Sequence, residues 1–157
     1  MKKLILFGVI ATFLFACGGS DAPKTPANPS STNEKTATGN PSYDPNRGAG
    51  KFTHVDVSPT LDKAKAEIGL KAYDVKCSGC HKLTDEKLVG PGWKGVTERF
   101  KAEWIMNFMT NTAEMLDKDP KAQAQLEICL VRMPNQNLSD EEAFGLYEYM
   151  RQNDGVK

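Results

Sequence analysis

The chain is 157 residues long, and its 20 basic residues balance its 20 acidic residues, so its formal net charge is zero. If Lys2 and Lys3 leave with an N-terminal signal, 18 basic and 20 acidic residues remain, a net charge of about −2. A protein with this balance lacks the positive field that binds nucleic acids. We therefore expect no nucleic acid among its partners.

The first 16 residues (1–16) are predicted to be a secretory signal peptide. Lys2 and Lys3 precede an apolar run over residues 4–15, the charged start and short hydrophobic core that are typical of such signals. The run is too short to cross a bilayer. It ends in the sequence LFAC, which resembles a bacterial lipobox, so we expect Cys17 to be lipidated and to anchor an exported, periplasmic protein to a membrane. The alternative is a protein that is free in the periplasm.

A linker is predicted from residue 17 to residue 55. Residues 18–50 contain five prolines among Ser, Thr, Asn and Gly, with almost no apolar side chains. Such a composition cannot bury enough apolar surface to fold, so the sequence indicates disorder. A flexible chain of this length has an end-to-end distance of roughly 30 Å. The domain beyond it could therefore move on a tether near membrane-bound partners.

Residues 56–157 are predicted to form one all-α domain of about four helices, because their apolar residues recur at helical spacing. The first helix is predicted over residues 59–76, with Ser58 as N-cap and Pro59 at the first helical position. Its expected apolar face consists of Leu61, Ala64, Ile68, Ala72 and Val75. Gly69 inside this helix costs about 1 kcal/mol relative to alanine, and we expect it to let the last helix approach closely.

The first helix leads into the sequence CSGCH at residues 77–81, a C-x-x-C-H motif. At this spacing two thiols can bond to the vinyl groups of one haem while the next imidazole reaches the iron, so the motif predicts covalent haem. A zinc site and a dithiol redox site are the alternatives. Zinc needs four Cys or His ligands, and the chain otherwise offers only Cys17, His54 and Cys129, without paired spacing. A dithiol motif normally lies near a βαβ unit, whereas these flanks are helical.

The second helix is predicted over residues 98–109. A stripe that can pack on a haem or on a core consists of Phe100, Trp104, Ile105 and Phe108. The third helix is predicted to begin with Asp119 as cap and Pro120 at the first helical position. Its apolar side consists of Ala122, Leu126, Cys129 and Leu130. We expect Cys129 to be a small buried hydrophobe without a disulfide partner.

The last helix has the clearest start, because Ser139 and Glu142 form a capping box. Its apolar residues follow at helical spacing and are Ala143, Leu146, Tyr147 and Met150. We expect this helix to pack across the first one.

Several landmarks together resemble the class I cytochromes c, over residues 56–153. Gly69 and Tyr73 precede the C-x-x-C-H motif at four-residue spacing, the sequence VGPGW follows at residues 89–93, and Met133 with Pro134 precedes the last helix. The resemblance implies a small all-helical fold wrapped around one covalent haem c. It also implies an electron carrier and not an enzyme.

The resemblance assigns roles position by position. Cys77 and Cys80 match the residues that form the thioether bonds to haem, and His81 matches the proximal ligand of its iron. Pro91 matches the proline whose carbonyl accepts a hydrogen bond from that imidazole. Met133 matches the second axial ligand, and it lies in irregular chain, from which a ligand can reach the opposite face of the haem.

His54, the only other histidine, is the rival axial ligand, and Met115 is another methionine in a predicted polar loop. The alternative function is a haem sensor or a peroxidase-like enzyme with an open iron site. Otherwise we expect a monomer in a periplasmic or membrane-surface respiratory chain, between a quinol-oxidising complex or another cytochrome and an oxidase or reductase. The lysines expected around its exposed haem edge are Lys76, Lys82, Lys87 and Lys94.

Overall fold

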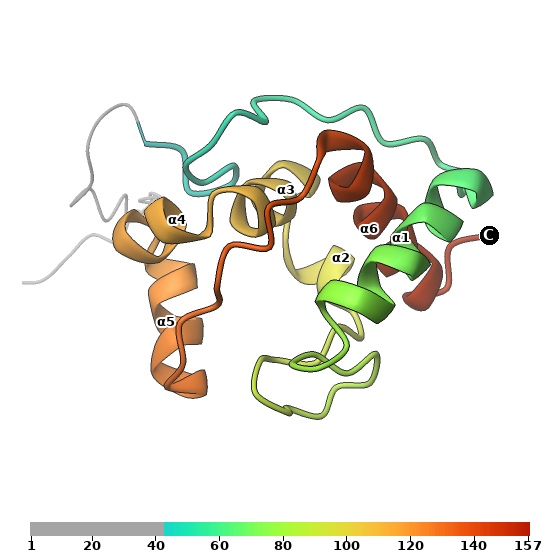
Figure 1. The fold of residues 1–157 in the computed structure, drawn as a ribbon. Helices are drawn as coiled ribbons and strands as arrows, with labels where there is room; N and C mark the ends of the chain where they lie inside the picture. Colours follow the sequence, from blue (N-terminus) through green and yellow to red (C-terminus); the bar gives the residue numbers. More distant parts are fainter. Residues whose placement is uncertain (1–42) are drawn as a thin grey trace, which may run out of the picture. The chain divides into compact units, whose positions relative to one another are not determined.

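The computed structural model describes residues 43–157; the expected signal peptide, Cys17 and the upstream part of the linker lie outside them. Within these residues the chain is all-helical, with six helices where the sequence predicts about four (Figure 1). The helices are α1 (Lys63–Lys76), α2 (Val96–Arg99), α3 (Ala102–Thr110), α4 (Thr112–Lys118), α5 (Pro120–Cys129) and α6 (Asp140–Asn153). None of these six has the length and apolar character that crossing a membrane requires.

Helices α1 and α6 pack against each other (Figure 1). Two glycines, Gly69 and Gly145, lie at their contact. A Cβ added at Gly69 would overlap the backbone carbonyl of Gly145, and one added at Gly145 would lie 2.8 Å from the amide nitrogen of Gly69. The two backbones are therefore in direct contact, which larger residues at these positions would prevent. This confirms that the last helix crosses the first at Gly69.

Helix α1 begins at Lys63 and not at Pro59, so the predicted start is wrong. Asp62 is its N-cap and accepts a hydrogen bond from the amide of Lys65 at 3.1 Å, which satisfies one of the free donors of the first turn. The predicted cap, Ser58, lies in a non-helical segment that precedes the helix.

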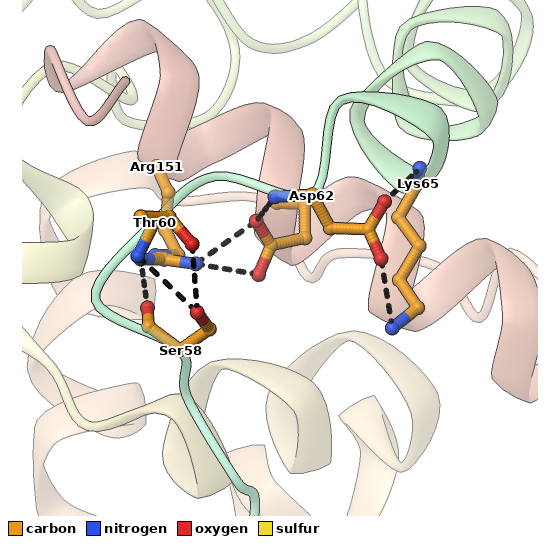
Figure 2. A network of polar contacts seen from close by, with 6 residues as sticks. Ser58, Thr60, Asp62, Lys65 and Arg151 are labelled. Carbon is orange, nitrogen blue, oxygen red and sulfur yellow. Dashed lines mark hydrogen bonds and ion pairs between the residues drawn. The ribbon is translucent and has the colours of Figure 1, made fainter.

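A buried ion pair on α6 fixes this preceding segment (Figure 2). Arg151 donates hydrogen bonds of 2.7 and 2.9 Å to the carboxylate of Glu148, and both residues are buried. The same carboxylate accepts the amide of Asp62 at 3.0 Å, while Arg151 donates to the carbonyl of Ser58 at 2.5 Å. Because α6 engages these backbone groups, residues 58–62 do not join the helix.

The buried face of α1 also differs from the predicted one. Its buried residues are Ala66, Gly69, Ala72 and Tyr73. Of the five residues expected on the apolar face, only Ala72 is buried, and Val75 is 84% exposed. Close contact with α6 at Gly69 favours small side chains along the interface, so the larger aliphatic residues lie beside it.

The predicted second helix is two helices, α2 and α3. Phe100 between them is extended, with φ −129° and ψ 148°. The break allows the Phe100 ring to stack on Trp104, with ring centroids 4.1 Å apart. The predicted aromatic side chains therefore do lie together, but on two helices with a break at Phe100 and not on one continuous helix.

Helix α4 replaces the polar loop that was expected around Met115. Met115 is fully buried, and its sulfur accepts a hydrogen bond from the amide of Ala49 at 3.0 Å. Of the polar residues in this short helix, Asp117 and Lys118 are exposed and Thr112 is buried, an arrangement that the sequence pattern alone did not reveal.

Residues 43–55 pack on α3 and α4, although the sequence assigns them to the linker. Asn107 on α3 is fully buried; its side chain accepts the amide of Phe52 at 2.9 Å and donates to the carbonyls of Phe52 at 2.9 Å and Arg47 at 3.0 Å. The packed domain thus begins upstream of the predicted boundary at residue 56. The composition did not predict that this segment packs on the domain, because backbone groups make many of its contacts and composition reflects only the side chains.

The predicted starts of the last two helices are confirmed. Asp119 caps α5 by accepting the amide of Ala122 at 2.8 Å. Ser139 and Glu142 form the capping box of α6, with hydrogen bonds of 3.1 and 2.9 Å. At the other end of α5, Leu130 adopts a left-handed conformation with φ 60°, a position that glycine usually takes.

Candidate functional site

Two adjoining hollows lie among the loop after α1, helices α3 and α5, and the segment that precedes α6. They enclose empty space of about 730 and 670 Å³, including the part that opens to solvent. The residues that line both are Cys77, His81, Pro91, Phe108, Gln125, Met133 and Gln136. Because these residues are shared, we treat the two hollows as one central hollow. Cys80, the remaining predicted cofactor-binding residue, lines only the second part of the central hollow.

The end of α1 positions the C-x-x-C-H motif. The amide of Cys77 donates to the carbonyl of Tyr73 at 2.9 Å, and the amide of His81 donates to the carbonyl of Cys77 at 2.9 Å. The hydroxyl of Tyr73 donates to the carbonyl of His81 at 2.8 Å. The motif therefore continues the helix in a tight turn that brings both thiols and the imidazole together.

The two cysteines of the motif differ in environment. Cys77 is buried, and burial raises the pKa of its thiol to about 11, so the thiol is protonated at neutral pH. Cys80 is exposed. One side of the central hollow is thus closed by Cys77, and its rim near Cys80 is open to solvent.

The His81 ring is held by the chain through a single nitrogen. Its Nδ1 lies 2.8 Å from the carbonyl oxygen of Pro91, and because a carbonyl can only accept, Nδ1 carries the hydrogen and Nε2 presents a lone pair. Burial lowers the pKa of His81, and the hydrogen bond to Pro91 offsets part of this effect. A Cβ at Gly90 would overlap the ring. The arrangement keeps a neutral imidazole in one orientation, as metal ligation requires.

An aromatic wall formed by Phe100 and two residues of α3 borders the central hollow. Phe100 and Trp104 stack with ring centroids 4.1 Å apart, and Phe108 continues the stack 5.2 Å from Trp104. The indole nitrogen of Trp104 donates to the buried carboxylate of Asp119 at 3.0 Å, and the hydroxyl of Tyr43 donates to the same oxygen. Burial, followed by this hydrogen bond, raises the pKa of Tyr43 above its usual range, so the phenol remains a donor.

Met133 is half-buried in the irregular segment between α5 and α6. It lines both parts of the central hollow, as His81 does, while Met109 and Met150 line only the first part. The rival histidine, His54, is exposed, and its Nε2 lies 2.8 Å from Asp56. The structure therefore brings Met133 and His81 to the same space and leaves His54 outside it.

The polar lining residues that were not predicted as part of the site include two glutamines and an arginine. Gln125 on α5 and Gln136 bring amide groups to both parts of the central hollow, and Arg99 brings a guanidinium to the first. Cys129 is half-buried and lines the second part, with Cys77 and Cys80. Sequence patterns give no signal for Gln125, Gln136 and Arg99, because a polar side chain on a short helix or in a loop is expected to be exposed to solvent until the packing is known.

The donor set fits a covalently bound haem. The walls of the central hollow are mostly apolar and aromatic, as a flat macrocycle requires. Two thiols can hold the group, the free Nε2 of His81 can bind iron, and the thioether of Met133 is a soft ligand of the kind that cytochromes c use.

Comparisons with known proteins agree with this geometry. The profile of the family described as cytochrome c matches residues 66–154. A solved cytochrome c from Rhodothermus marinus is 31% identical, with a TM-score of 0.64, over 67% of this chain and 90% of that one. An engineered form of that protein is 31% identical with a TM-score of 0.67, over 71% and 98% of the two chains. The engineered form bound to a carbene intermediate has a TM-score of 0.64 at the same identity and coverage. No curated protein matches the chain.

Proposed function

Because this chain belongs to the cytochrome c family, whose class I members bind one covalent haem c and carry electrons, we propose that it is an exported single-electron carrier of a respiratory chain. Its donor would be a quinol-oxidising complex or another cytochrome, and its acceptor an oxidase or a reductase. The observation that supports this most strongly is the convergence of Cys77, Cys80, His81 and Met133 on one apolar hollow.

Each of these residues has a proposed role in holding the cofactor. Cys77 and Cys80 would form the thioether bonds to haem, and His81 and Met133 would bind its iron. Bound haem supplies an iron that changes reversibly between the ferric and ferrous states. Pro91 keeps the His81 ring in orientation and raises its basicity through the 2.8 Å hydrogen bond. Met133 raises the reduction potential relative to a second nitrogen ligand.

Export and anchoring rest on the N-terminal sequence. We propose that residues 1–16 are removed as a lipoprotein signal and that Cys17 carries the lipid that places the protein at a membrane on the periplasmic side. Covalent haem and an exported location are mutually consistent, since class I cytochromes c are typically exported. The part of the linker before residue 43 would join the lipid to the domain.

The ligand assignment is tested by Met133→Ala in the full-length, haem-loaded protein. We expect covalent haem to remain, the midpoint potential to fall by at least on the order of 100 mV, and carbon monoxide to bind rapidly to the ferrous form. Spectroelectrochemical titration and carbon monoxide mixing measure both effects. Met106→Leu is the matched control, because Met106 is fully buried but lies outside the central hollow. An unchanged potential and spectrum in Met133→Ala would exclude Met133 as a ligand.

The same mixing experiment on the wild-type protein separates a carrier from the sensor or peroxidase-like alternative. A carrier whose iron would be bound by both His81 and Met133 should bind carbon monoxide slowly at neutral pH. Rapid binding by the wild-type protein would contradict the proposed function.

A further inference from the structure

The side chain of Asp119 is a fully buried acid to which the proposed function gives no role. Its Oδ1 accepts a hydrogen bond from the amide of Ala122 at 2.8 Å. Its Oδ2 accepts one from the indole nitrogen of Trp104 at 3.0 Å and another from the hydroxyl of Tyr43. Both oxygens therefore act as acceptors, as those of an ionised carboxylate do, so the surroundings suit a buried negative charge.

No cation of the described part of the chain forms an ion pair with Asp119. The cations closest in sequence, Lys118 and Lys121, are exposed; the first pairs with Glu114 at 2.7 Å, and the second donates to the carbonyl of Pro45 at 2.9 Å. Position at the N-terminus of α5, where the helix dipole is positive, stabilises the carboxylate. Because water and salt screen a buried charge only weakly, its field extends into the protein interior.

The indole of Trp104 joins this carboxylate to the central hollow. Trp104 lines the first part of the hollow, whereas Asp119 lines neither part. Residues 43–55, which pass over α3 and α4 (Figure 1), cover the same edge of the indole, since a Cβ added at Gly48 would lie 3.4 Å from Cδ1 of Trp104. Asp119 thus lies behind one aromatic ring of the wall, shielded from water by the upstream segment.

We propose that Asp119 is a positioning residue of the redox site, which holds the Trp104 ring against the central hollow and lowers the reduction potential through its negative charge. Reduction adds one electron and removes one positive charge from the bound haem. A nearby negative charge stabilises the more positive ferric state, and it does so more strongly in the interior, where the effective dielectric constant is low. This inference deepens the proposed function and rests on it, because it requires haem in the central hollow.

Spectroelectrochemical titration of Asp119→Asn in the full-length, haem-loaded protein tests the proposal. Asparagine is an equally good N-cap but carries no charge. We expect the equilibrium constant for reduction to rise about tenfold, which is 59 mV for one electron. Glu127→Gln is the matched control, because it removes the same charge from an exposed position on α5, and we expect a change below about twofold. An unchanged constant in Asp119→Asn, or an equal rise in the control, would overturn the proposal.

The direction of the change separates a charge effect from loosened packing. Loosening admits water to the haem, which favours the more highly charged ferric state and lowers the equilibrium constant. Tyr43→Phe removes one hydrogen bond to the carboxylate and leaves its charge less well neutralised, so we expect the constant to fall by about twofold. Asp119→Asn and Tyr43→Phe should therefore shift the potential in opposite directions, and a rise in both would contradict the proposed role of the charge.

A second pair of variants covers the case that Asp119→Asn alone does not fold, since its amide group can face the indole N–H. Trp104→Phe keeps an aromatic ring and removes that donor. Adding Asp119→Asn to Trp104→Phe should again raise the constant about tenfold, and no rise would refute the proposal. In 1 M salt, where the Debye length is about 3 Å, the rise should persist; its loss would assign the effect to surface charge instead.

Proton NMR of the Trp104 indole N–H, identified by its loss in Trp104→Phe, gives a readout besides the potential. We expect this resonance to shift in Asp119→Asn and to stay in place in Glu127→Gln; an unshifted resonance in Asp119→Asn would exclude the positioning role. A reversible one-electron reduction of the wild type with no effect of Asp119→Asn would sink this inference alone. A wild type without covalent haem, or without reversible reduction, would contradict the proposed function, and the role of Asp119 would fail with it.

Discussion

At Gly69 the backbone of α1 lies so close to α6 that a side chain of any size would overlap the carbonyl of Gly145. We expect Gly69→Ala to lower the free energy of unfolding of the haem-loaded protein by about 3 kcal/mol, because backbone on both sides must move to admit one methyl group. Denaturant unfolding measures the change.

The matched control for Gly69→Ala is Gly79→Ala. A Cβ at Gly79 meets no atom within 4 Å, so we expect a change below about 0.5 kcal/mol. Equal effects of the two substitutions would show that the contact between α1 and α6 does not explain the glycine at position 69.

Single residues of the candidate site could be predicted to different degrees. The motif spacing identified Cys77, Cys80 and His81, and a family resemblance added Met133; the structure places all four on the central hollow. Asp119 was recognised only as a helix cap. Its hydrogen bond from Trp104 joins residues on different helices, and no pattern along the chain encodes such a contact.

Among the elements, local signals predicted helix starts well and helix continuity poorly. Asp119 with Pro120, and Ser139 with Glu142, define the starts of α5 and α6 as expected. The start of α1 was wrong because tertiary hydrogen bonds from α6 engage the backbone at residues 58–62. Extended Phe100, which divides the predicted second helix, packs its ring on Trp104, a preference that helical periodicity does not reveal.

The segment 43–55 depends on one side chain for much of its attachment to α3. We expect Asn107→Ala to leave the buried backbone groups of Phe52 and Arg47 without partners, and to cost about 3 kcal/mol. Hydrogen exchange should show that residues 43–55 lose protection before the rest of the domain.

Asn46→Ala is the control for Asn107→Ala, since Asn46 lies in the same segment with its side chain exposed. Full protection of the Phe52 amide in Asn107→Ala would mean that the segment is held mainly by its buried apolar side chains.

For the whole molecule, the central hollow means that the domain lacks a complete core unless haem fills it. Without haem, aromatic and aliphatic side chains from five helices, α2 to α6, would face water, with a cost of about 25 cal/mol per Å² of apolar surface. We therefore expect Cys77→Ala combined with Cys80→Ala to abolish covalent haem and most of the stable helical structure, as measured by a haem stain and circular dichroism.

The control for the double variant is Cys129→Ser, which should retain haem and fold because Cys129 is only half-buried at the end of α5. A double variant with native helix content and a cooperative thermal transition would contradict the view that haem completes the core.

The two ends of helix α5 have different surroundings. At its start Asp119 accepts a hydrogen bond from Tyr43, where the described chain begins, and at its end Ile128 and Leu130 are exposed. Ten helical residues span about 15 Å. If the upstream chain is a tether, as proposed, its pull would act at the end of α5 that is remote from Cys129, which lines the central hollow.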